Sequence, residues 1–396
     1  MRSPTGISFF ARTNARASSI PFGFRQPDRL FHAYLIGKTG TGKSTLLETL
    51  ALQDIRAGHG CAVIDPHGDL VARLAHSIPE SRKADSIYLD APSPTQPFGY
   101  NPLRRVRYDK IPLAASGLME AWKKLWTDAW GVRMEHVLRN ALYALLETEG
   151  ATLPDILRLM SDTGYRRQVV SSLRNEQVKD FWLSEFPKYN PRYRQETIAP
   201  IQNKVGAFLA DPRLYRILVK PKIDLSFRKI MDEGKVLLVN LSKGELGEDS
   251  AALLGSLLVT TLSLAAFSRA ETPEEKRKPF FLYIDEFQSM TTLSVAGMIS
   301  ELRKYGVGLV LANQHLAQLP PEVRSAVLGN VGTLIAFRLG PEDARIIAKE
   351  LSPVFSEEDL MNLPNHDIYL RLMIDGRPSK PFSATTMHPE ELPKAA

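Results

Sequence analysis

Cysteine is nearly absent from the sequence, which has only Cys61 among its 396 residues. A disulfide framework and a zinc site built from cysteine pairs are therefore excluded within one chain. A small buried side chain in a strand is the simplest interpretation of Cys61. This cysteine usage fits a reducing compartment, and we expect a cytoplasmic protein.

Long hydrophobic runs are also scarce. The segment Met1–Arg29 contains scattered arginines and no continuous apolar stretch, which argues against a secretory signal. The one long uncharged stretch, Ala251–Ser268, reaches the roughly 17–25 residues of a membrane-spanning helix. However, it carries Gly255, Ser256 and Thr260 and lies between two predicted core strands. We interpret it as a buried helix and expect no intrinsic membrane span.

No internal repeat and no low-complexity tract occurs. The composition, 44% hydrophobic and 24% charged, is ordinary for a folded protein of two or three domains. The net charge of +6 is unevenly distributed: residues 101–230 contain 23 lysines and arginines and 14 acidic residues, a local net of +9, which leaves −3 for the rest. Two interpretations stay open, a solvated helical surface or a face that meets a polyanion.

Short apolar strands alternate with longer helical stretches, which indicates an α/β domain with a mainly parallel sheet. The first core strand runs directly into a glycine-rich turn and then into a predicted helix, Lys43–Ala57. The predicted strands are His32–Ile36, Cys61–Ile64, Ser86–Asp90, Val236–Leu241, Phe280–Ile284, Gly308–Ala312 and Thr333–Phe337.

The character of the sequence changes between the third and fourth of these strands. This stretch is rich in helix formers and tryptophans, and prolines such as Pro200 divide it into short predicted helices. Near the end of the chain, Ile368–Ile374 is predicted as a short edge strand. The predicted organisation is an N-terminal arm (1–30), an α/β core (31–102 and 229–352), an inserted all-α domain (103–228) and a C-terminal tail (353–396).

The segment from Gly37 to Ser44, GKTGTGKS, matches the phosphate-binding pattern G-x-x-x-x-G-K-[ST] and lies between a strand and a helix. Its glycines permit backbone angles closed to other residues, so that successive N–H groups can point at a phosphate. Lys43 would meet the β- and γ-phosphates, and the Ser44 hydroxyl would join a Mg²⁺ shell at the positive end of the helix. The predicted ATP-binding residues are Gly37, Thr39, Gly40, Thr41, Gly42, Lys43, Ser44 and Thr45.

A buried apolar strand, Phe280–Ile284, ends in two adjacent carboxylates. A phosphate-binding loop alone does not separate kinases, switches and motors, whereas a carboxylate placed to polarise water favours hydrolysis. Asp285 would hold the Mg²⁺ together with Ser44, and Glu286 would activate the attacking water. An acidic pair at a helix N-cap is the competing interpretation.

Two further strands end in polar groups. The strand Leu309–Ala312 leads to Gln314, which we predict to contact the γ-phosphate and to report its loss. The turn after the second strand holds Asp65, His67 and Asp69, three potential metal ligands. With a single histidine and no paired cysteine nearby, we prefer a polar turn above the nucleotide, in which His67 senses the phosphates.

These elements, in this order and around a large helical insert, resemble the HerA/FtsK superfamily of DNA-pumping ATPases, and most closely the TraG/VirD-type coupling proteins of conjugation and type IV secretion. The phosphate-binding loop is generic, but the Asp-Glu strand with the downstream Arg-Lys-Tyr-Gly and Asn-Gln residues is much more specific. The resemblance spans Phe31–Arg345. It is carried by Tyr34–Leu47 (YLIGKTGTGKSTLL), Val63–Leu70 (VIDPHGDL), Gly99–Leu103 (GYNPL), Leu238–Gly244 (LVNLSKG), Leu282–Phe287 (LYIDEF), Glu301–Gln314 (ELRKYGVGLVLANQ) and Asn330–Gly340 (NVGTLIAFRLG).

The resemblance implies a RecA-like core and a ring, usually a homo-hexamer, with ATP at the subunit boundaries. In such rings an arginine of the neighbouring subunit completes each site and contributes roughly 10³–10⁵ in rate. Arg303 is in the position where coupling proteins of this family have that arginine, and Arg338, after the strand Thr333–Phe337, is the rival candidate. A surface salt bridge is the competing interpretation of either residue.

The chain departs from the family pattern before the phosphate-binding loop. Membrane-anchored coupling proteins carry transmembrane helices there and HerA carries a small β-barrel, whereas only 36 residues precede Gly37. We therefore expect a compact member without a membrane span, which a partner recruits to the inner membrane face.

The function implied by the resemblance is an ATP-driven DNA-translocating motor of conjugative transfer or type IV secretion, with a relaxase or a secretion channel as possible partners. The insert corresponds to the all-α domain that receives substrate, and its charge fits contacts with the phosphates of single- or double-stranded DNA. An ATPase that recruits protein substrates without pumping DNA is the alternative, and a nucleotide switch is a third. The candidate DNA contacts are Arg104, Arg105, Arg107, Lys123, Lys124, Tyr189, Arg192, Tyr193 and Arg194.

Overall fold

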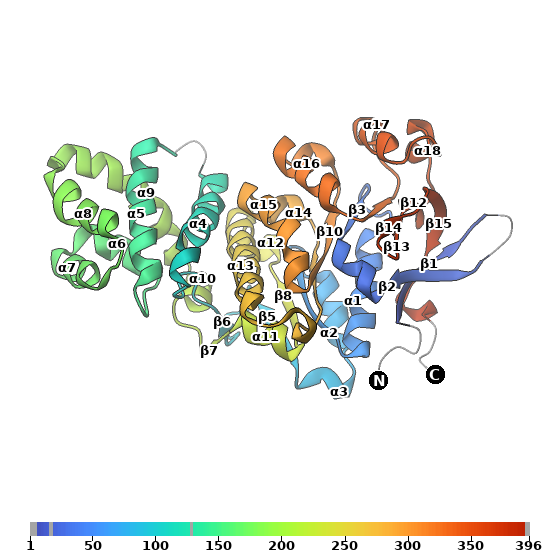
Figure 1. Ribbon diagram of the computed structural model, residues 1–396, viewed down its shortest axis with the longest axis horizontal. Coiled ribbons are helices and arrows are strands. Elements are labelled where there is room, and N and C mark those ends of the chain that lie inside the picture. The colour runs from blue at the N-terminus through green and yellow to red at the C-terminus, as the bar shows by residue number, and fades with distance from the viewer. Residues whose placement is uncertain (1–5, 16–18, 127–129, 393–396) are drawn as a thin grey trace. The chain divides into compact units, whose positions relative to one another are not determined.

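The computed structural model describes residues 6–15, 19–126 and 130–392 (Figure 1). The chain divides into two compact units, an α/β unit that we call the core unit and a largely helical one that we call the helical unit. The core unit comprises Met1–Asp90, Phe227–Ser242 and Ala265–Ala396, and the helical unit comprises Ala91–Ser226 and Lys243–Leu264.

The core unit is built on an eleven-stranded sheet in the order β2-β1-β15-β12-β11-β3-β10-β9-β4-β8-β5. The strands from β11 to β5 are all parallel and mostly buried, as expected when both faces of a sheet are covered. Each predicted strand is present, with ends shifted by at most one residue, which confirms the α/β prediction. These strands are β3 (Ala33–Ile36), β4 (Gly60–Asp65), β5 (Ser86–Asp90), β8 (Val236–Asn240), β9 (Phe280–Ile284), β10 (Val307–Asn313) and β11 (Thr333–Ala336).

Antiparallel strands from the two ends of the chain extend this sheet, and in Figure 1 they are the neighbouring blue and red arrows. The prediction of an edge strand at Ile368–Ile374 is wrong, because β12 lies between β11 and β15 in the sheet interior. Both neighbours of β12 come from other parts of the chain, so its own residues carried no signal of its place. The antiparallel strands are β1 (Ile7–Thr13), β2 (Pro21–Arg25), β12 (Asp367–Arg371) and β15 (Phe382–Thr386).

Two helices, α1 (Lys43–Ala57) and α2 (Asp69–His76), pack on one face of the sheet. Leu46, Leu50 and Leu74 join strand side chains in one buried cluster, and each leucine buried in this way contributes about 1.5–3 kcal/mol. The start and end of α1 agree with the sequence prediction. The other helices of the core unit are α3 (Glu80–Lys83), α11 (Phe227–Glu233), α14 (Phe287–Met290), α15 (Leu293–Leu302), α16 (Pro321–Asn330), α17 (Pro341–Glu350) and α18 (Glu357–Met361).

The helical unit has its own core of leucine, alanine and aromatic side chains, among them Leu138, Leu142 and Trp182. The prediction that Pro200 ends a helix is wrong, because this residue lies inside α9. Two-residue strands β6 (Phe98–Gly99) and β7 (Ile223–Asp224) pair at the start and end of the insert. The helices are α4 (Ile111–Leu125), α5 (Val132–Glu147), α6 (Pro154–Ser161), α7 (Thr163–Ser172), α8 (Glu176–Asp180), α9 (Pro191–Ala210), α10 (Pro212–Leu218) and α12 (Lys243–Leu246).

The helical unit also takes in a segment that follows a core strand in the sequence. This segment is the part of α13 (Glu248–Ser268) that ends at Leu264. At Gly117 of α4, a Cβ atom would lie 2.5 Å from Thr260 Cγ2 of α13. Because only a glycine permits this approach, α13 packs closely against the insert.

The long uncharged stretch lies in α13. Among the described residues, one helical segment, Glu248–Glu271, has the length and composition of a membrane span, with a mean hydropathy of 1.8. However, 78% of its apolar window is buried within the protein. This burial is what the sequence predicts for a core helix.

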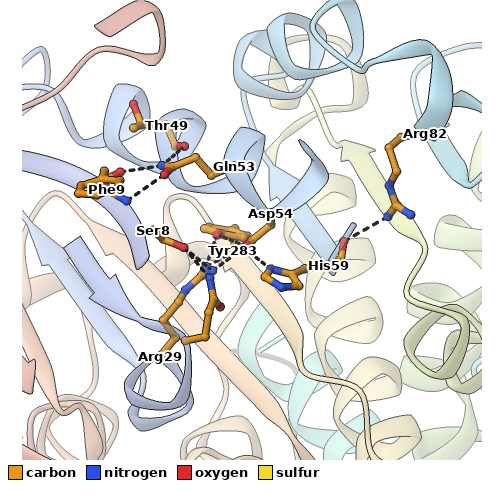
Figure 2. A network of polar contacts seen from close by, with 10 residues as sticks. Ser8, Phe9, Arg29, Thr49, Gln53, Asp54, His59, Arg82 and Tyr283 are labelled. Carbon is orange, nitrogen blue, oxygen red and sulfur yellow. Dashed lines mark hydrogen bonds and ion pairs between the residues drawn. The ribbon is translucent and has the colours of Figure 1, made fainter. Parts of the chain in front are cut away.

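A buried ion pair ties the C-terminal end of α1 to the rest of the core unit (Figure 2). Arg29 donates to both oxygens of Asp54, at 2.8 Å to Oδ2, and to the Tyr283 hydroxyl at 2.6 Å. Tyr283 in turn donates to Asp54 Oδ2 at 2.5 Å, and the Ser8 hydroxyl accepts from Arg29 at 3.2 Å. The side chains of Arg29 and Asp54 are 3% and 0% exposed, so each charge depends on its protein partners.

The two charges stabilise each other's ionised form. Burial disfavours the ionised carboxylate of Asp54, but the adjacent Arg29 guanidinium outweighs this effect and lowers the pKa of the carboxyl. At Arg29, burial is likewise outweighed by the Asp54 carboxylate, which raises the pKa of the guanidinium. A carboxyl whose folded pKa lies below its unfolded value stabilises the fold above the unfolded pKa, and this contribution is lost as the pH falls through the folded pKa.

We expect Arg29→Met to lower the free energy of unfolding by about 3–5 kcal/mol, because it leaves the Asp54 carboxylate buried without its counter-charge. Adding Asp54→Leu should recover most of this loss, because no uncompensated charge then remains. Urea unfolding of the full chain measures both variants. The stability advantage of the wild type over the double variant should shrink as the pH is lowered.

Arg25→Met is the matched control, because the ion pair of Arg25 with Asp375 has side chains 57% and 64% exposed. Its free energy of unfolding should stay within about 1 kcal/mol of the wild type. Equal losses of unfolding free energy in the Arg29 and Arg25 variants would show that burial of the charge does not determine the effect on stability.

Candidate nucleotide-binding site

The phosphate-binding loop connects β3 to α1 at the carboxyl edge of the parallel strands. Gly40 and Gly42 have φ angles of 75° and 119°, in the region that glycine adopts readily. At Gly37, a Cβ atom would lie 2.5 Å from Phe337 Cβ, so the residue that follows β11 approaches the loop too closely for any side chain. The first turn of α1 follows directly, and its free N–H groups face the position that an anion would take.

Lys43 lies inside this loop and is buried. Its Nζ donates to the carbonyl oxygens of Gly37 at 2.6 Å and of Lys38 at 3.0 Å. Burial lowers the pKa of the ammonium group, although the carboxylates of Asp285 and Glu286 oppose the shift. A phosphate would supply the negative charge that this buried lysine lacks in its immediate shell.

Two other predicted residues of the loop serve its own backbone. The Thr41 hydroxyl is buried and donates to Lys38 O at 2.7 Å. The Thr45 carbonyl accepts from the Thr49 hydroxyl at 2.9 Å, one turn further along α1. Thr41 therefore stabilises the loop's shape, and a contact of the Thr45 side chain with nucleotide stays a prediction.

Ser44 and Asp285 meet at the start of α1, as the magnesium prediction requires. The Ser44 hydroxyl donates to Asp285 Oδ2 at 2.8 Å, across 241 residues of sequence. Burial raises the pKa of Asp285; the Ser44 hydrogen bond opposes this shift, and the neighbouring carboxylates of Glu286 and Asp65 add to it. Such a carboxylate is stabilised by a nearby cation, and a serine hydroxyl with a carboxylate is a donor set that Mg²⁺ accepts.

Glu286 belongs to a chain of hydrogen bonds that begins in the phosphate-binding loop. The Thr39 hydroxyl donates to Gln314 Oε1 at 2.9 Å, and Gln314 Nε2 donates to Glu286 Oε1 at 2.5 Å. Gln288 donates to the other carboxylate oxygen of Glu286. The structure therefore brings together Thr39, Glu286 and Gln314, which lie far apart in the sequence.

The backbone of Glu286 is unusual, with a φ of 49° that non-glycine residues rarely adopt. Such outliers occur preferentially at functional sites, where the surroundings hold them in place. Here the turn after β9 redirects the chain, so that Asp285 faces Ser44 while the next carboxylate faces Gln314. Glu286 is the N-cap residue of α14, as the competing interpretation requires, but its side chain makes no cap hydrogen bond to that helix.

Two site residues were missed in the sequence analysis. Asn313 Nδ2 donates to Gln288 Oε1 at 2.8 Å, and Asn313 O accepts from Gly37 N at 3.3 Å. Asn313 Oδ1 is buried and has no partner among the described residues. In the sequence, Asn313 belonged to the Asn-Gln pair of the family resemblance without an assigned role, and the only signal for Gln288 was its place two residues after Glu286.

A loop from the C-terminal part of the chain lies against the phosphate-binding loop and was also missed. His366 N donates to Thr41 O at 3.0 Å, and Thr386 N donates to His366 O at 2.8 Å. The φ of His366 is 71°, and a Cβ atom on Gly42 would lie 2.9 Å from its Nδ1. No local signal could have placed His366 here, because more than 300 residues separate it from Gly42.

The turn after β4 is a helix cap. Asp65 Oδ1 accepts from His67 N at 2.8 Å, and Asp65 Oδ2 accepts from Leu70 N at 2.8 Å and from Val71 N at 3.3 Å. Among the described residues, no group of three or more histidine, cysteine, aspartate or glutamate side chains could hold a metal ion. The polar turn is therefore the better interpretation, and a role for His67 in phosphate sensing stays a prediction.

Arg303 lies at the opposite edge of the sheet from the phosphate-binding loop, just before β10. At about 3.3 Å per residue, β10 places it on the order of 20 Å from Gln314, so it cannot complete the site of its own subunit. Its exposed guanidinium lies over the Phe31 ring, 3.4 Å from the centroid. The adjacent His32 accepts from Leu309 N at 3.1 Å and contacts Ile299 O at 3.0 Å, which fixes this segment between α15 and β10.

Arg338, the rival, lies beside the phosphate-binding loop of its own subunit. Its carbonyl accepts from Lys38 N at 2.9 Å. Its guanidinium donates to Leu363 O at 3.3 Å and to Asn365 Oδ1 at 2.9 Å. These contacts engage Arg338 within one subunit, whereas Arg303 is an exposed residue whose guanidinium lies over the Phe31 ring.

Most of the candidate DNA-contacting residues form ion pairs or hydrogen bonds with other residues of the helical unit. These ion pairs are exposed, and pairs of this kind contribute little and yield readily to a stronger ligand. The positive charge of the unit therefore does not by itself define a site. Arg104 pairs with Asp224, Arg107 with Asp109 at 3.0 Å, Lys123 with Glu135 at 3.9 Å and Arg192 with Glu196 at 3.0 Å, while Arg194 donates to Pro187 O at 3.0 Å and Tyr189 to Glu185 at 2.6 Å.

Solved structures show the same fold. The bacterial conjugative coupling protein TrwB in an unbound form has a TM-score of 0.65 at 17% identity, over 95% of this chain and 88% of that one. TrwB in complex with ADP and Mg²⁺ has 0.65 at 19% identity, over 96% and 89%. VirB4 of Thermoanaerobacter pseudethanolicus has 0.64 at 14% identity, over 98% and 97%. At these identities the likeness establishes the architecture, with a mainly parallel sheet and a helical unit.

Sequence comparison agrees with the structural likeness. The type 4 coupling protein DotL of Legionella pneumophila is 21% identical over 370 residues, which cover 78% of this chain. The chain spans only 47% of the length of that relative. A family model described as the type IV secretion-system coupling protein DNA-binding domain matches residues 15–363. The resemblance to coupling proteins is thereby confirmed, and the chain belongs to the family of type IV secretion-system coupling proteins, in their DNA-binding domain.

Proposed function

We propose that this chain is the ATP-hydrolysing motor of a type IV secretion coupling protein and that it moves DNA as a ring of identical subunits. The observation that carries the proposal is the chain Thr39–Gln314–Glu286, together with the Ser44–Asp285 hydrogen bond. It connects the phosphate-binding loop to both carboxylates of β9. A simple nucleotide-binding module needs the loop but not these connections.

Each residue has a role in hydrolysis. Lys43 and the N–H groups of the loop bind the phosphates, and Ser44 with Asp285 would hold Mg²⁺, which neutralises charge on the phosphate oxygens. Glu286 polarises the attacking water as a general base. Gln314 contacts both Thr39 and Glu286, so a change at the γ-phosphate alters its hydrogen bonds on both sides.

The position of Arg303 supports the proposal of a ring. A cationic side chain that cannot reach its own site, yet is exposed and supported by Phe31, suits the site of a neighbouring subunit. One solved structure that this chain resembles is that of a coupling protein in complex with ADP and Mg²⁺. Their shared fold supports ATP and Mg²⁺ as the cofactors here.

Several finer assignments belong to the same proposal. The core unit performs the ATP chemistry, and the helical unit, the counterpart of the predicted insert at residues 103–228, receives the substrate. A relaxase or the secretion channel is the expected protein partner, and it brings the motor to the inner membrane face.

A second function is favoured by one observation, the ion pairing of most of the basic candidate DNA contacts in the helical unit. An ATPase that recruits protein substrates would need no phosphate-binding surface there. The two functions differ in their response to DNA.

ATP turnover, measured over a range of protein concentrations with and without single- and double-stranded DNA, tests the proposal. We expect specific activity to rise with protein concentration, because the site is completed between subunits, and to rise again when DNA is added. Activity indifferent to both DNA forms would overturn the DNA motor and leave the recruiting ATPase. An ATPase activity that does not depend on protein concentration, in a protein that stays monomeric over the range tested, would overturn the ring.

A further inference from the structure

The helical unit contains a cleft of about 380 Å³, to which the exposed ion pairs described above assign no role. This size falls within the roughly 300–1,000 Å³ of small-ligand sites. Three arginines from two separate segments converge on it, together with a tyrosine. Its lining residues are Arg105, Val106, Arg107, Tyr108, Ile111, Glu147 and Arg174.

Hydrogen bonds fix the segments that line the cleft. Asn101 Nδ2 donates to Ala151 O at 2.6 Å and Asn101 Oδ1 accepts from Leu103 N at 3.0 Å, which fixes the segment that enters the cleft. On the opposite side, Arg174 N donates to Glu147 Oε1 at 2.5 Å. The walls are therefore anchored to the loop after α5 and to the C-terminal end of that helix.

The three arginines of the cleft are paired to different extents. Arg174 has no side-chain ion pair among the described residues, while Arg105 lies 4.0 Å from the exposed Glu149. Arg107 is bonded to Asp109, with both side chains more than half exposed. Exposed pairs of this kind contribute about 0–1 kcal/mol, whereas an arginine fork binds a phosphate bidentately. The negative charge of the Glu147 carboxylate is partly compensated by the Arg174 N–H group, from which it accepts a hydrogen bond.

The apolar surface narrows the choice of ligand. Tyr108 is 49% exposed and lines the cleft, together with Val106 and the buried Ile111. An inorganic anion would use only the arginines. A ligand with a planar ring and a phosphate would contact both the arginines and the apolar side chains. Because the cleft is open, a polymeric ligand could continue beyond it.

We propose that this cleft binds one nucleotide of single-stranded DNA, with the phosphate on Arg105 and Arg174 and the base on Tyr108. This inference rests on the proposed function and adds to it a strand preference and a site. A duplex does not expose a base face, so Tyr108 would contribute only to single strands. An acidic protein segment, the other polyanion to consider, would gain little from the tyrosine ring.

Fluorescence anisotropy of labelled dT20 and of a 20-base-pair duplex, titrated with the full chain, tests the inference. Tyr108→Ala should weaken dT20 binding by roughly 5- to 150-fold, the effect of losing one stacked base, and leave duplex binding unchanged. Tyr108→Phe should keep the wild-type affinity. Arg174→Ala should weaken dT20 binding and reduce the slope of log affinity against log salt by about 0.7.

Arg158→Ala is the matched control, because this exposed arginine pairs with Asp162 in the same unit but outside the cleft. It should leave the affinity for dT20 unchanged. Wild-type affinity in both Tyr108→Ala and Arg174→Ala would overturn the cleft as a nucleotide site, even if DNA stimulates the ATPase. Equal weakening of dT20 and duplex by Tyr108→Ala, or competition by deca-glutamate as strong as by dT10, would overturn base stacking. A wild type that binds neither DNA would overturn the proposed function as well.

Discussion

Replacing Glu286 with glutamine is expected to lower ATP turnover by about 10²–10⁴-fold, the contribution of a positioned general base. Glutamine keeps the size of the side chain and can still accept from Gln314, but it cannot take a proton from water. Binding of ATP should be preserved, because the phosphates contact Lys43 and the loop rather than this carboxylate. Steady-state turnover and fluorescent-nucleotide titration separate the two effects.

Glu301→Gln provides the control for Glu286→Gln. Glu301 is a carboxylate of α15 that pairs with Lys304 at 2.9 Å, away from the site. The control should turn over ATP at the wild-type rate. Wild-type turnover in Glu286→Gln would assign activation of water to another group.

Arg303→Ala should lower turnover by roughly 10³–10⁵-fold, as expected for an arginine that acts across a subunit boundary. Its stacking on Phe31 is worth only about 0.5–1 kcal/mol at an exposed position, so stability should change little. The size of the kinetic loss therefore distinguishes a catalytic arginine from a surface contact. Lys304→Ala, at the next position, should behave as wild type.

Mixing two inactive variants tests whether Arg303 acts in trans. A subunit with Arg303→Ala has an intact phosphate site, and a subunit with Glu286→Gln has an intact arginine. In equal mixtures that exchange subunits, about a quarter of the boundaries combine an intact site with an intact arginine, so turnover should return to about a quarter of the wild-type value. No recovery in a mixture shown to exchange would assign Arg303 to its own subunit or to structure.

Local signals determined much of the core unit. The helix from Lys43 to Ala57 was predicted with correct ends, because Gly42 precedes it and Gly58, with a φ of 81°, follows it in the conformation that ends helices. The parallel strands were found because they are short apolar runs buried on both faces, a pattern that needs no knowledge of neighbours.

The antiparallel part of the sheet had no such signal. β12 pairs with β11 and β15, and β1 pairs with β15 across more than 350 residues. Strand pairing depends on which segments meet, and this depends on the whole chain. The segment was therefore recognised as a strand but placed at the wrong position in the sheet.

The sequence by itself indicated the residues that we propose carry the chemistry. A lysine in a glycine-rich loop and two carboxylates at the end of an apolar strand are each recognisable within a few residues, because their function depends on local backbone geometry. Only the tertiary structure decided their connections. The order β9-β10-β3 aligns three strand ends, so that Ser44 meets Asp285 and Gln314 joins Thr39 to Glu286. The place of His366 and the nucleotide-sized cleft around Tyr108 were decided in the same way, because such contacts join segments that have no local signal in common.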